Sequence, residues 1–258
     1  MQFAKWLRAL VLLGINLVPT FGWFFAGWSL STMLLLYWFE NIASSFFIAA
    51  RILIHRKMTR CAGHVEYAPP DAKKSSFQSG SYLQGYLTAM LVFSAVQGIF
   101  LLLLIFLLFP RSYAGQRGAE EVDYHGLKLG CTAVVMLLTG NFIADLPGLR
   151  NRSFRWIEML GQNSLGRVVL IQFTIIFGMM ALAFTGGVRG FFGIFIGLKT
   201  LADVGSAFPS ETPKEPPRSI VSIINFFKPG EKESFENFWY REDKDEAARE
   251  KKNERRRP

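Results

Sequence analysis

The chain has 258 residues, 50% of them hydrophobic, and carries a net charge of +9 at pH 7. Its mean hydropathy is +0.23, although residues 208–258 hold 12 Lys/Arg and 11 Asp/Glu. The other 207 residues are apolar in long stretches, on all sides of any helix they form, which excludes an ordinary soluble domain. Because the excess positive charge lies within this apolar part, it indicates membrane topology, and we expect no nucleic-acid partner.

Six apolar segments follow one another along the chain, and each reaches the roughly 20 residues that a membrane-spanning helix needs. They are residues 6–27, 30–54, 81–109, 126–146, 164–185 and 188–207. We therefore predict an all-α polytopic membrane protein. Residues 1–207 would form a bundle of about six transmembrane helices, and residues 208–258 would form a polar cytoplasmic tail.

The first segment contains Gly14, Pro19 and Gly22, which predict a kink or break in its helix. No small-residue cleavage site follows this segment, so we interpret it as a retained helix and not as a signal peptide. Only Trp28 and Ser29 separate it from the second segment. The two segments should form a tight helical hairpin.

The connections between the segments alternate between rich and poor in Lys and Arg. Five basic residues follow the second segment, whereas only Arg189 separates the fifth from the sixth. Lys- and Arg-rich connections stay in the cytoplasm. The alternation predicts a cytoplasmic (inner) membrane location with both termini in the cytoplasm.

The connection after the fourth segment has an amphipathic character. Arg150, Arg152 and Arg155 lie beside an apolar side that includes Phe154 and Trp156. Such a stretch favours a short interfacial helix over 151–161 whose arginines contact anionic lipid head groups. The alternative is a plain basic cytoplasmic loop.

The tail begins with Pro209, Pro213, Pro216 and Pro217, a composition typical of linkers. Residues 234–257 are dense in charge, which indicates either a solvated helix or a disordered segment.

Two ionisable residues of opposite charge should meet inside the bundle. Glu40 lies ~15 Å below the outer start of the second segment, and Lys199 lies ~16 Å below the outer start of the sixth. Asn16 and Gln172 fall near the same level. We predict that Glu40 and Lys199 pair across these two helices.

The polar cluster around this pair, which we extend to Asn41 and Asp203, has two interpretations. Polar side chains can simply hold membrane helices together. Ionisable groups at membrane depth also mark sites for ions, protons or polar ligands. Asp203 lies near the inner end of its segment, where it could reach water or Arg51.

The sequence lacks several motifs of catalysis. It has no H-E-x-x-H, no G-x-S-x-G and no phosphate-binding loop. We place His55, His64 and His125 in loops, the first two on the inner side and the third on the outer side, as plain surface residues. We predict no metal and no cofactor.

The stretches Leu34–Asn41 (L-L-L-Y-W-F-E-N) and Gly197–Gly205 (G-L-K-T-L-A-D-V-G) resemble a family of small prokaryotic multi-pass membrane proteins that is known only as a domain of unknown function. The match covers about 10–55 and 140–205. The family's W-x-E-N and K-T-x-x-D pieces fall on Trp38, Glu40, Asn41, Lys199, Thr200 and Asp203. The family pattern also includes histidines in the membrane helices, where this chain offers only Gln97 and Gln172. The resemblance implies a fold class and no activity.

Three hypotheses of function follow. The first is a transporter-like bundle, not an enzyme, that binds a small ligand or ion at the Glu40/Lys199 cluster. The second is an intramembrane or interfacial enzyme that acts on a lipid or small polar substrate, with Glu40 as acid or base. The third is a membrane scaffold that recruits partners through its tail.

Overall fold

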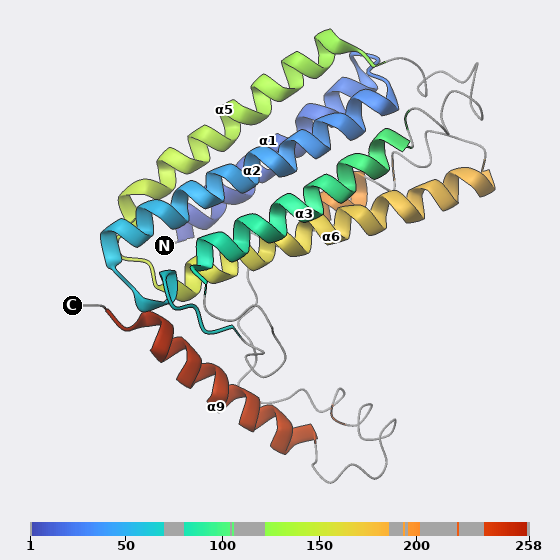
Figure 1. Cartoon of the computed structure of the whole chain (residues 1–258). Helices are drawn as coiled ribbons and strands as arrows, with labels where there is room; N and C mark the ends of the chain where they lie inside the picture. Colours follow the sequence, from blue (N-terminus) through green and yellow to red (C-terminus); the bar gives the residue numbers. More distant parts are fainter. Residues whose placement is uncertain are drawn as a thin grey trace.

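The computed structural model is all-α within the residues it describes, which are 2–69, 80–103, 105, 122–185, 193, 196–201, 221 and 235–256. Its named helices are α1 (Gln2–Phe24), α2 (Leu30–Thr59), the short 3₁₀ helix η1 (Ala62–His64), α3 (Tyr82–Leu103), α5 (Tyr124–Leu149), α6 (Phe154–Thr185) and α9 (Phe235–Glu254). Five long helices, α1, α2, α3, α5 and α6, lie side by side as a bundle, and α9 leaves one end of it at an angle (Figure 1).

Three of these helices are long and apolar enough to cross a membrane, namely α2, α3 and α5, and a shorter apolar stretch covers Leu13–Phe24. These spans support a membrane location. The fifth predicted segment, 164–185, forms the second part of α6, and the sixth is described at residues 193 and 196–201, which are helical.

The predicted hairpin between the first two segments is present. Gly27 adopts a left-handed backbone conformation with φ of 68°, which glycine accepts without steric cost. Ser29 then caps α2, because its side-chain oxygen accepts a hydrogen bond from the backbone N–H of Thr32 at 3.2 Å. Pro19 lies inside α1, which continues unbroken to Phe24.

Trp28, at the tip of this hairpin, packs against α1 and α5. A methyl group added at Gly126 would come within 2.5 Å of the indole ring, and one added at Gly130 within 3.1 Å. The absence of side chains at these two glycines therefore lets α5 approach closely, as small residues do between membrane helices.

The buried apolar side chains form two clusters along the bundle. One cluster lies toward the Trp28 end and includes Ile15, Met33 and Leu36. The other includes Ile52 of α2 and Phe154 of α6. Many large apolar side chains on the outside of the bundle are exposed, including Phe46, Leu91 and Phe177, as expected where lipid is the solvent.

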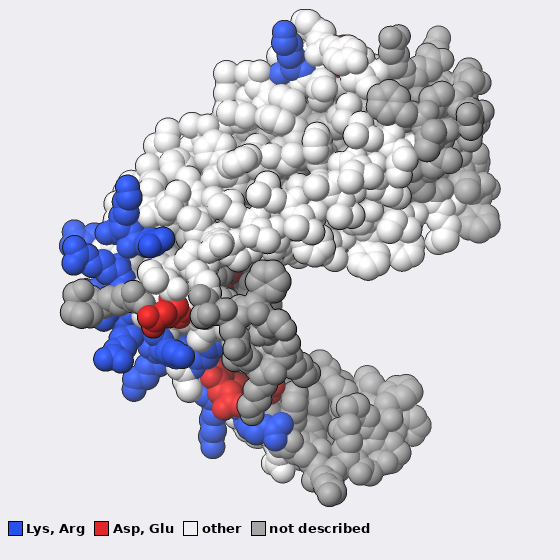
Figure 2. All heavy atoms as spheres, in the orientation of Figure 1, with Lys and Arg blue, Asp and Glu red and all other residues white. Residues whose placement is uncertain are grey.

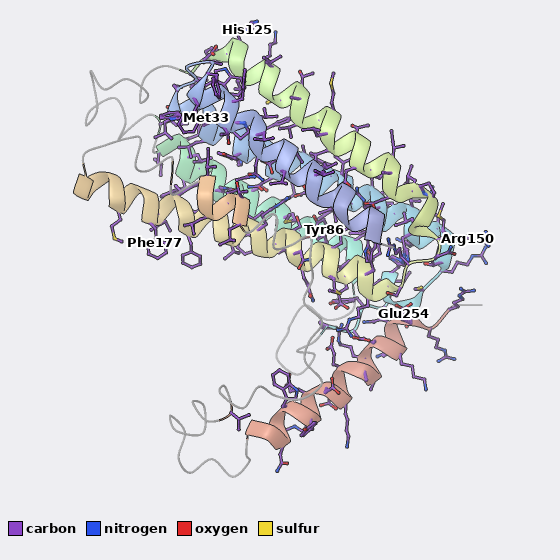
Figure 3. The ribbon with its side chains drawn as sticks, turned by 180° about the vertical axis from the view of Figure 1, so that it is seen from behind. Met33, Tyr86, His125, Arg150, Phe177 and Glu254 are labelled. Atoms are coloured by element: carbon purple, nitrogen blue, oxygen red, sulfur yellow. The ribbon has the colours of Figure 1, made fainter. Side chains whose placement is uncertain are left out.

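On the face drawn in Figure 2, charged side chains gather at one end of the bundle, and the surface over the long helices is almost free of them. This charged end includes the exposed Arg56, Lys57 and Arg60 after the second segment, and Arg150 between α5 and α6. His125 lies at the opposite end from Arg150 and Glu254 (Figure 3).

The connection from α5 to α6 differs from the prediction of a short interfacial helix or a loop. Ser153 accepts a hydrogen bond from the backbone N–H of Trp156 at 3.2 Å, and α6 then runs for 32 residues from Phe154. The side chains of Phe154 and Ile157 are buried in the second apolar cluster. Residues 154–161 are therefore the first turns of a long bundle helix.

Candidate functional site

The predicted pair of Glu40 and Lys199 is confirmed. The ammonium Nζ of Lys199 lies 3.2 Å from Oε2 of Glu40 and donates a hydrogen bond to Oε1, also at 3.2 Å. The exposed fraction is 1% for Glu40 and 0% for Lys199. The two charges therefore neutralise each other inside the bundle, away from water.

Two further side chains surround the Lys199 ammonium. It donates a second hydrogen bond, at 2.9 Å, to Oδ1 of the buried Asn16 on α1. It also lies 5.0 Å from the centre of the Tyr37 ring, within the range of a cation–π contact. Three segments that are distant in sequence thus meet at one ammonium group.

Asn41, one residue after Glu40, faces α3 instead. Its amide nitrogen donates to Oε1 of Gln97 at 3.4 Å, and both side chains are buried. The other amide atoms, Oδ1 of Asn41 and Nε2 of Gln97, have no hydrogen-bond partner among the described residues. They leave one acceptor and one donor available in the interior.

The remaining members of the predicted cluster are Gln172 and Asp203. Oε1 of Gln172, on α6, is buried and has no hydrogen-bond partner within the described part of the chain. Asp203 lies outside the described residues. The structure therefore brings together Glu40, Lys199 and Asn16, with Asn41 beside them on the next face of α2.

A second ion pair, which was not predicted from the sequence, joins Arg51 of α2 to Asp145 of α5. Arg51 donates from Nε to Oδ2 of Asp145 on α5 at 3.0 Å, and its guanidinium lies 5.2 Å from the centre of the Phe142 ring. From the sequence, we suggested instead that Asp203 could reach Arg51 or water. Arg51 and Asp145 lie near the inner ends of the second and fourth segments. Their similar depth and opposite charge could have predicted the pair.

A polar pocket lies next to this pair, between α2, α5 and α6. Its volume is about 70 Å³. Arg167 of α6 reaches across it and donates to the hydroxyl of Ser44 on α2 at 2.7 Å. Ser44 is one turn beyond Glu40, so polar groups continue along α2 from the Glu40–Lys199 pair toward the charged end.

The three arginines predicted to contact lipid head groups lie at the charged end. Arg150 is exposed. The guanidinium carbon of Arg152 lies 5.2 Å from the centre of the Trp156 ring, a cation–π contact. Arg155 forms an ion pair with Glu250 of α9.

The tail helix α9 docks onto the bundle through a buried charge pair that sequence reasoning missed. Arg249 donates to Oε1 of Glu158 at 2.6 Å, and the Tyr67 hydroxyl donates to the same oxygen. Burial, followed by the hydrogen bond to Glu158, raises the pKa of Tyr67 above its usual value. Glu254 also accepts from the backbone N–H of Arg155 at 3.2 Å, a favourable place for a carboxylate at a helix N-terminus.

The prediction that His55 and His64 are surface residues in loops is wrong. His55 lies within α2, and both side chains are buried. His55 Nδ1 and His64 Nε2 are 2.8 Å apart, and His55 Nε2 lies 3.0 Å from the carbonyl oxygen of Arg152. Burial, with His55 and Arg56 nearby, lowers the pKa of His64 to about 4. Within the described residues, no group of three or more His, Cys, Asp or Glu could hold a metal ion.

A family model describes most of this chain. The model of DUF6498, a family of unknown function, matches residues 1–219, so the docked helix α9 lies beyond the matched part. No curated protein matches the chain, and no solved structure does so either. The match covers all the described members of the Glu40–Lys199 cluster. The chain therefore belongs to the DUF6498 family.

Proposed function

We propose that this protein is a transporter-like bundle of the cytoplasmic membrane that binds a small polar ligand or ion in its interior. In this proposal six helices span the membrane and both termini lie in the cytoplasm. The charged end of the bundle faces the cytoplasm, and the Trp28 end faces outward.

The distribution of charge supports this orientation. The exposed basic residues after α2 and between α5 and α6 lie at one end of the bundle, as cytoplasmic connections do. Both chain ends lie toward that same end (Figure 1). An even number of spans is consistent with this placement of the termini.

The observation that carries the proposal is the desolvated Glu40–Lys199 pair. Removing two charges from water costs several kcal/mol per ion, and their attraction only partly offsets that cost. Well-packed apolar residues would hold the same helices at lower cost. Ionisable residues kept at membrane depth are accordingly associated with ion, proton and substrate paths.

The buried amides of α2, α3 and α6 favour binding over a purely structural role. A buried polar atom without a hydrogen bond costs ~1–3 kcal/mol. Asn41, Gln97 and Gln172 each keep one such atom within the described part of the chain. A ligand or water that enters the bundle would satisfy these atoms, whereas a set of groups selected only to join helices would be expected to satisfy one another.

Cysteine accessibility tests whether the interior is open to water. Cys61 and Cys131 are first replaced by serine, and Ser44→Cys and Ala43→Cys are then made separately. Ser44 borders the polar pocket, whereas its neighbour Ala43 packs in the apolar core. Inverted membrane vesicles are treated with a small, negatively charged, membrane-impermeant thiosulfonate.

We expect the reagent to modify the protein with Ser44→Cys and to leave the protein with Ala43→Cys unmodified. A free ligand that enters the site should slow the modification. If neither cysteine reacts in folded protein, the interior is closed, and the polar cluster serves only to join the helices.

A further inference from the structure

The pocket between α2, α5 and α6 is rich in hydrogen-bond donors. Its polar lining consists of Ser44, Arg51, Asn141, Asn163, Ser164 and Arg167. Two of these side chains are guanidinium groups, each a planar fork of N–H donors. The hydroxyl and amide side chains add further donors, so the pocket is suited to a group that accepts many hydrogen bonds.

The charge of the lining favours an anion. Among the described residues that line the pocket, two are arginines and none is a carboxylate. Asp145 lies beside the pocket and pairs with Arg51 at 3.0 Å. Across the pocket, Arg167 donates to the hydroxyl of Ser44 at 2.7 Å. An anion placed between the two guanidiniums would gain a charge-assisted hydrogen bond from each.

The depth of the pocket agrees on all three helices. Arg51 lies eight residues before the end of α2, Asn141 eight before the end of α5, and Asn163 nine after the start of α6. At 1.5 Å per residue each lies ~12–14 Å from the helix ends at the charged end. In the proposed orientation this level lies in the inner half of the membrane, within reach of the cytoplasm and of the inner leaflet.

We propose that this pocket binds a phosphate group. Phosphate presents several strong acceptor oxygens and matches the bidentate geometry of arginine. The volume of about 70 Å³ has room for a group of five heavy atoms, because a single water needs only ~10–15 Å³ on the same measure. The phosphate belongs either to a small cytoplasmic molecule or to the head group of an inner-leaflet lipid.

This assignment rests on the proposed function, since the phosphate must enter an interior that is open at the charged end. Its tests use the full-length purified protein and two probes. The first probe is inorganic phosphate, added to protein in neutral detergent at constant ionic strength, with chloride as the reference anion. The second is phosphatidylglycerol, supplied in nanodiscs and compared with nanodiscs of phosphatidylcholine alone.

The variant Arg167→Gln removes one guanidinium from the pocket, and Lys128→Gln is its control, because Lys128 is an exposed cation near the start of α5 and does not line the pocket. Thermal unfolding at increasing probe concentration gives the apparent affinity. We expect Arg167→Gln to lower the apparent affinity for the stabilising probe at least about tenfold, as the loss of a charge-assisted hydrogen bond implies. Lys128→Gln should leave the affinity unchanged.

A second variant covers the case in which Arg167→Gln does not fold. Asn163→Phe leaves both guanidiniums in place and fills the pocket, because Asn163 is an exposed residue of its lining. Asn163→Phe should also abolish the increase in thermal stability that the probe causes in the wild type.

The two probes separate the sources of phosphate. Stabilisation by inorganic phosphate assigns a soluble ligand, and stabilisation by phosphatidylglycerol alone assigns a lipid head group. If neither probe stabilises the wild type, or if the pocket variants respond as Lys128→Gln does, the phosphate assignment is wrong. Modification of Ser44→Cys in that same case would leave the open interior, and the proposed function, intact.

Discussion

The ammonium of Lys199 lies 3.2 Å from the carboxylate of Glu40, buried inside a bundle whose long helices show almost no charged side chains on the face drawn in Figure 2. The same ammonium donates to Asn16 at 2.9 Å. Each charge is stabilised by the other, so neither can be lost without leaving its partner buried and alone. This dependence gives the first prediction.

Reversal of both charges should rescue what either reversal alone destroys. Glu40→Lys or Lys199→Glu places two like charges together in the interior, which we expect to cost ~3–5 kcal/mol or more. The double variant restores the attraction, and the amide of Asn16 can turn to donate to the new carboxylate. Fluorescence-detected size-exclusion chromatography and thermal unfolding measure the recovery. Equal loss of folded protein in all three variants would contradict a simple pair.

The docking of α9 should depend on Arg249. Its guanidinium and the Glu158 carboxylate are 9% and 3% exposed, and Arg249→Ala would leave Glu158 buried without its cation. We expect ~3 kcal/mol of lost docking free energy and release of α9 from the bundle. Cys61 is buried beside Glu254, so its reaction with a maleimide should become faster.

Lys244→Ala is the matched control for Arg249→Ala, since Lys244 is an exposed cation on the same helix. It should leave the rate of Cys61 modification unchanged. Slow modification of Cys61 in both variants would show that α9 stays docked without Arg249.

Acid should weaken the structure at the charged end through His64. The folded pKa of His64 is about 4, below the ordinary value near 6.5, so the unfolded state binds the proton first as the pH falls. Stability is therefore full above pH 6.5 and decreases between pH 6.5 and 4, by ~3 kcal/mol at most. Thermal unfolding across this range, with His64→Phe as the comparison, measures the effect. An identical pH dependence in that variant would rule out His64 as the cause.

The neutral state of the histidine pair has a geometric basis. His55 Nε2 faces a carbonyl oxygen and must carry a hydrogen, which leaves Nδ1 as the acceptor for His64 Nε2–H. His64 Nδ1 then has no partner among the described residues. A proton added there would be buried without an acceptor, which agrees with the lowered pKa of His64.

Packing between α2 and α3 should be sensitive to Gly98. A methyl group at this position would lie 2.8 Å from the Trp38 ring, and the indole N–H of Trp38 donates to the Ser94 carbonyl at 2.9 Å. Gly98→Ala should destabilise the protein by ~1–3 kcal/mol, as overpacking does. Gly85→Ala, on the same helix and with open space around it, is the control and should be neutral or stabilising in thermal unfolding.

The sequence was sufficient to predict the helices whose apolar pattern is uninterrupted, and the depth of Glu40 was sufficient to find Lys199. It failed where polar residues interrupt a pattern without ending a helix. Arg155 and Glu158 gave the first turns of α6 the composition of a connection, because their charges are paired with residues of α9.

The sequence also did not predict contacts between residues that are far apart along the chain. His64 is buried because η1 folds back under Phe154, with the two rings 5.0 Å apart. Such packing depends on the path of the whole chain, and no local periodicity reports it. The partners of α9 lie 91 or more residues away for the same reason.

Native mass spectrometry of the full-length protein, released gently from its membrane, tests the central claim most directly. The claim is that the polar interior of the bundle holds a ligand. We expect a bound small molecule or phospholipid on the wild type and on Gly85→Ala, and its loss from Asn41→Leu and Arg167→Gln. Bare wild-type protein, or an adduct that persists unchanged in both interior variants, would contradict the claim.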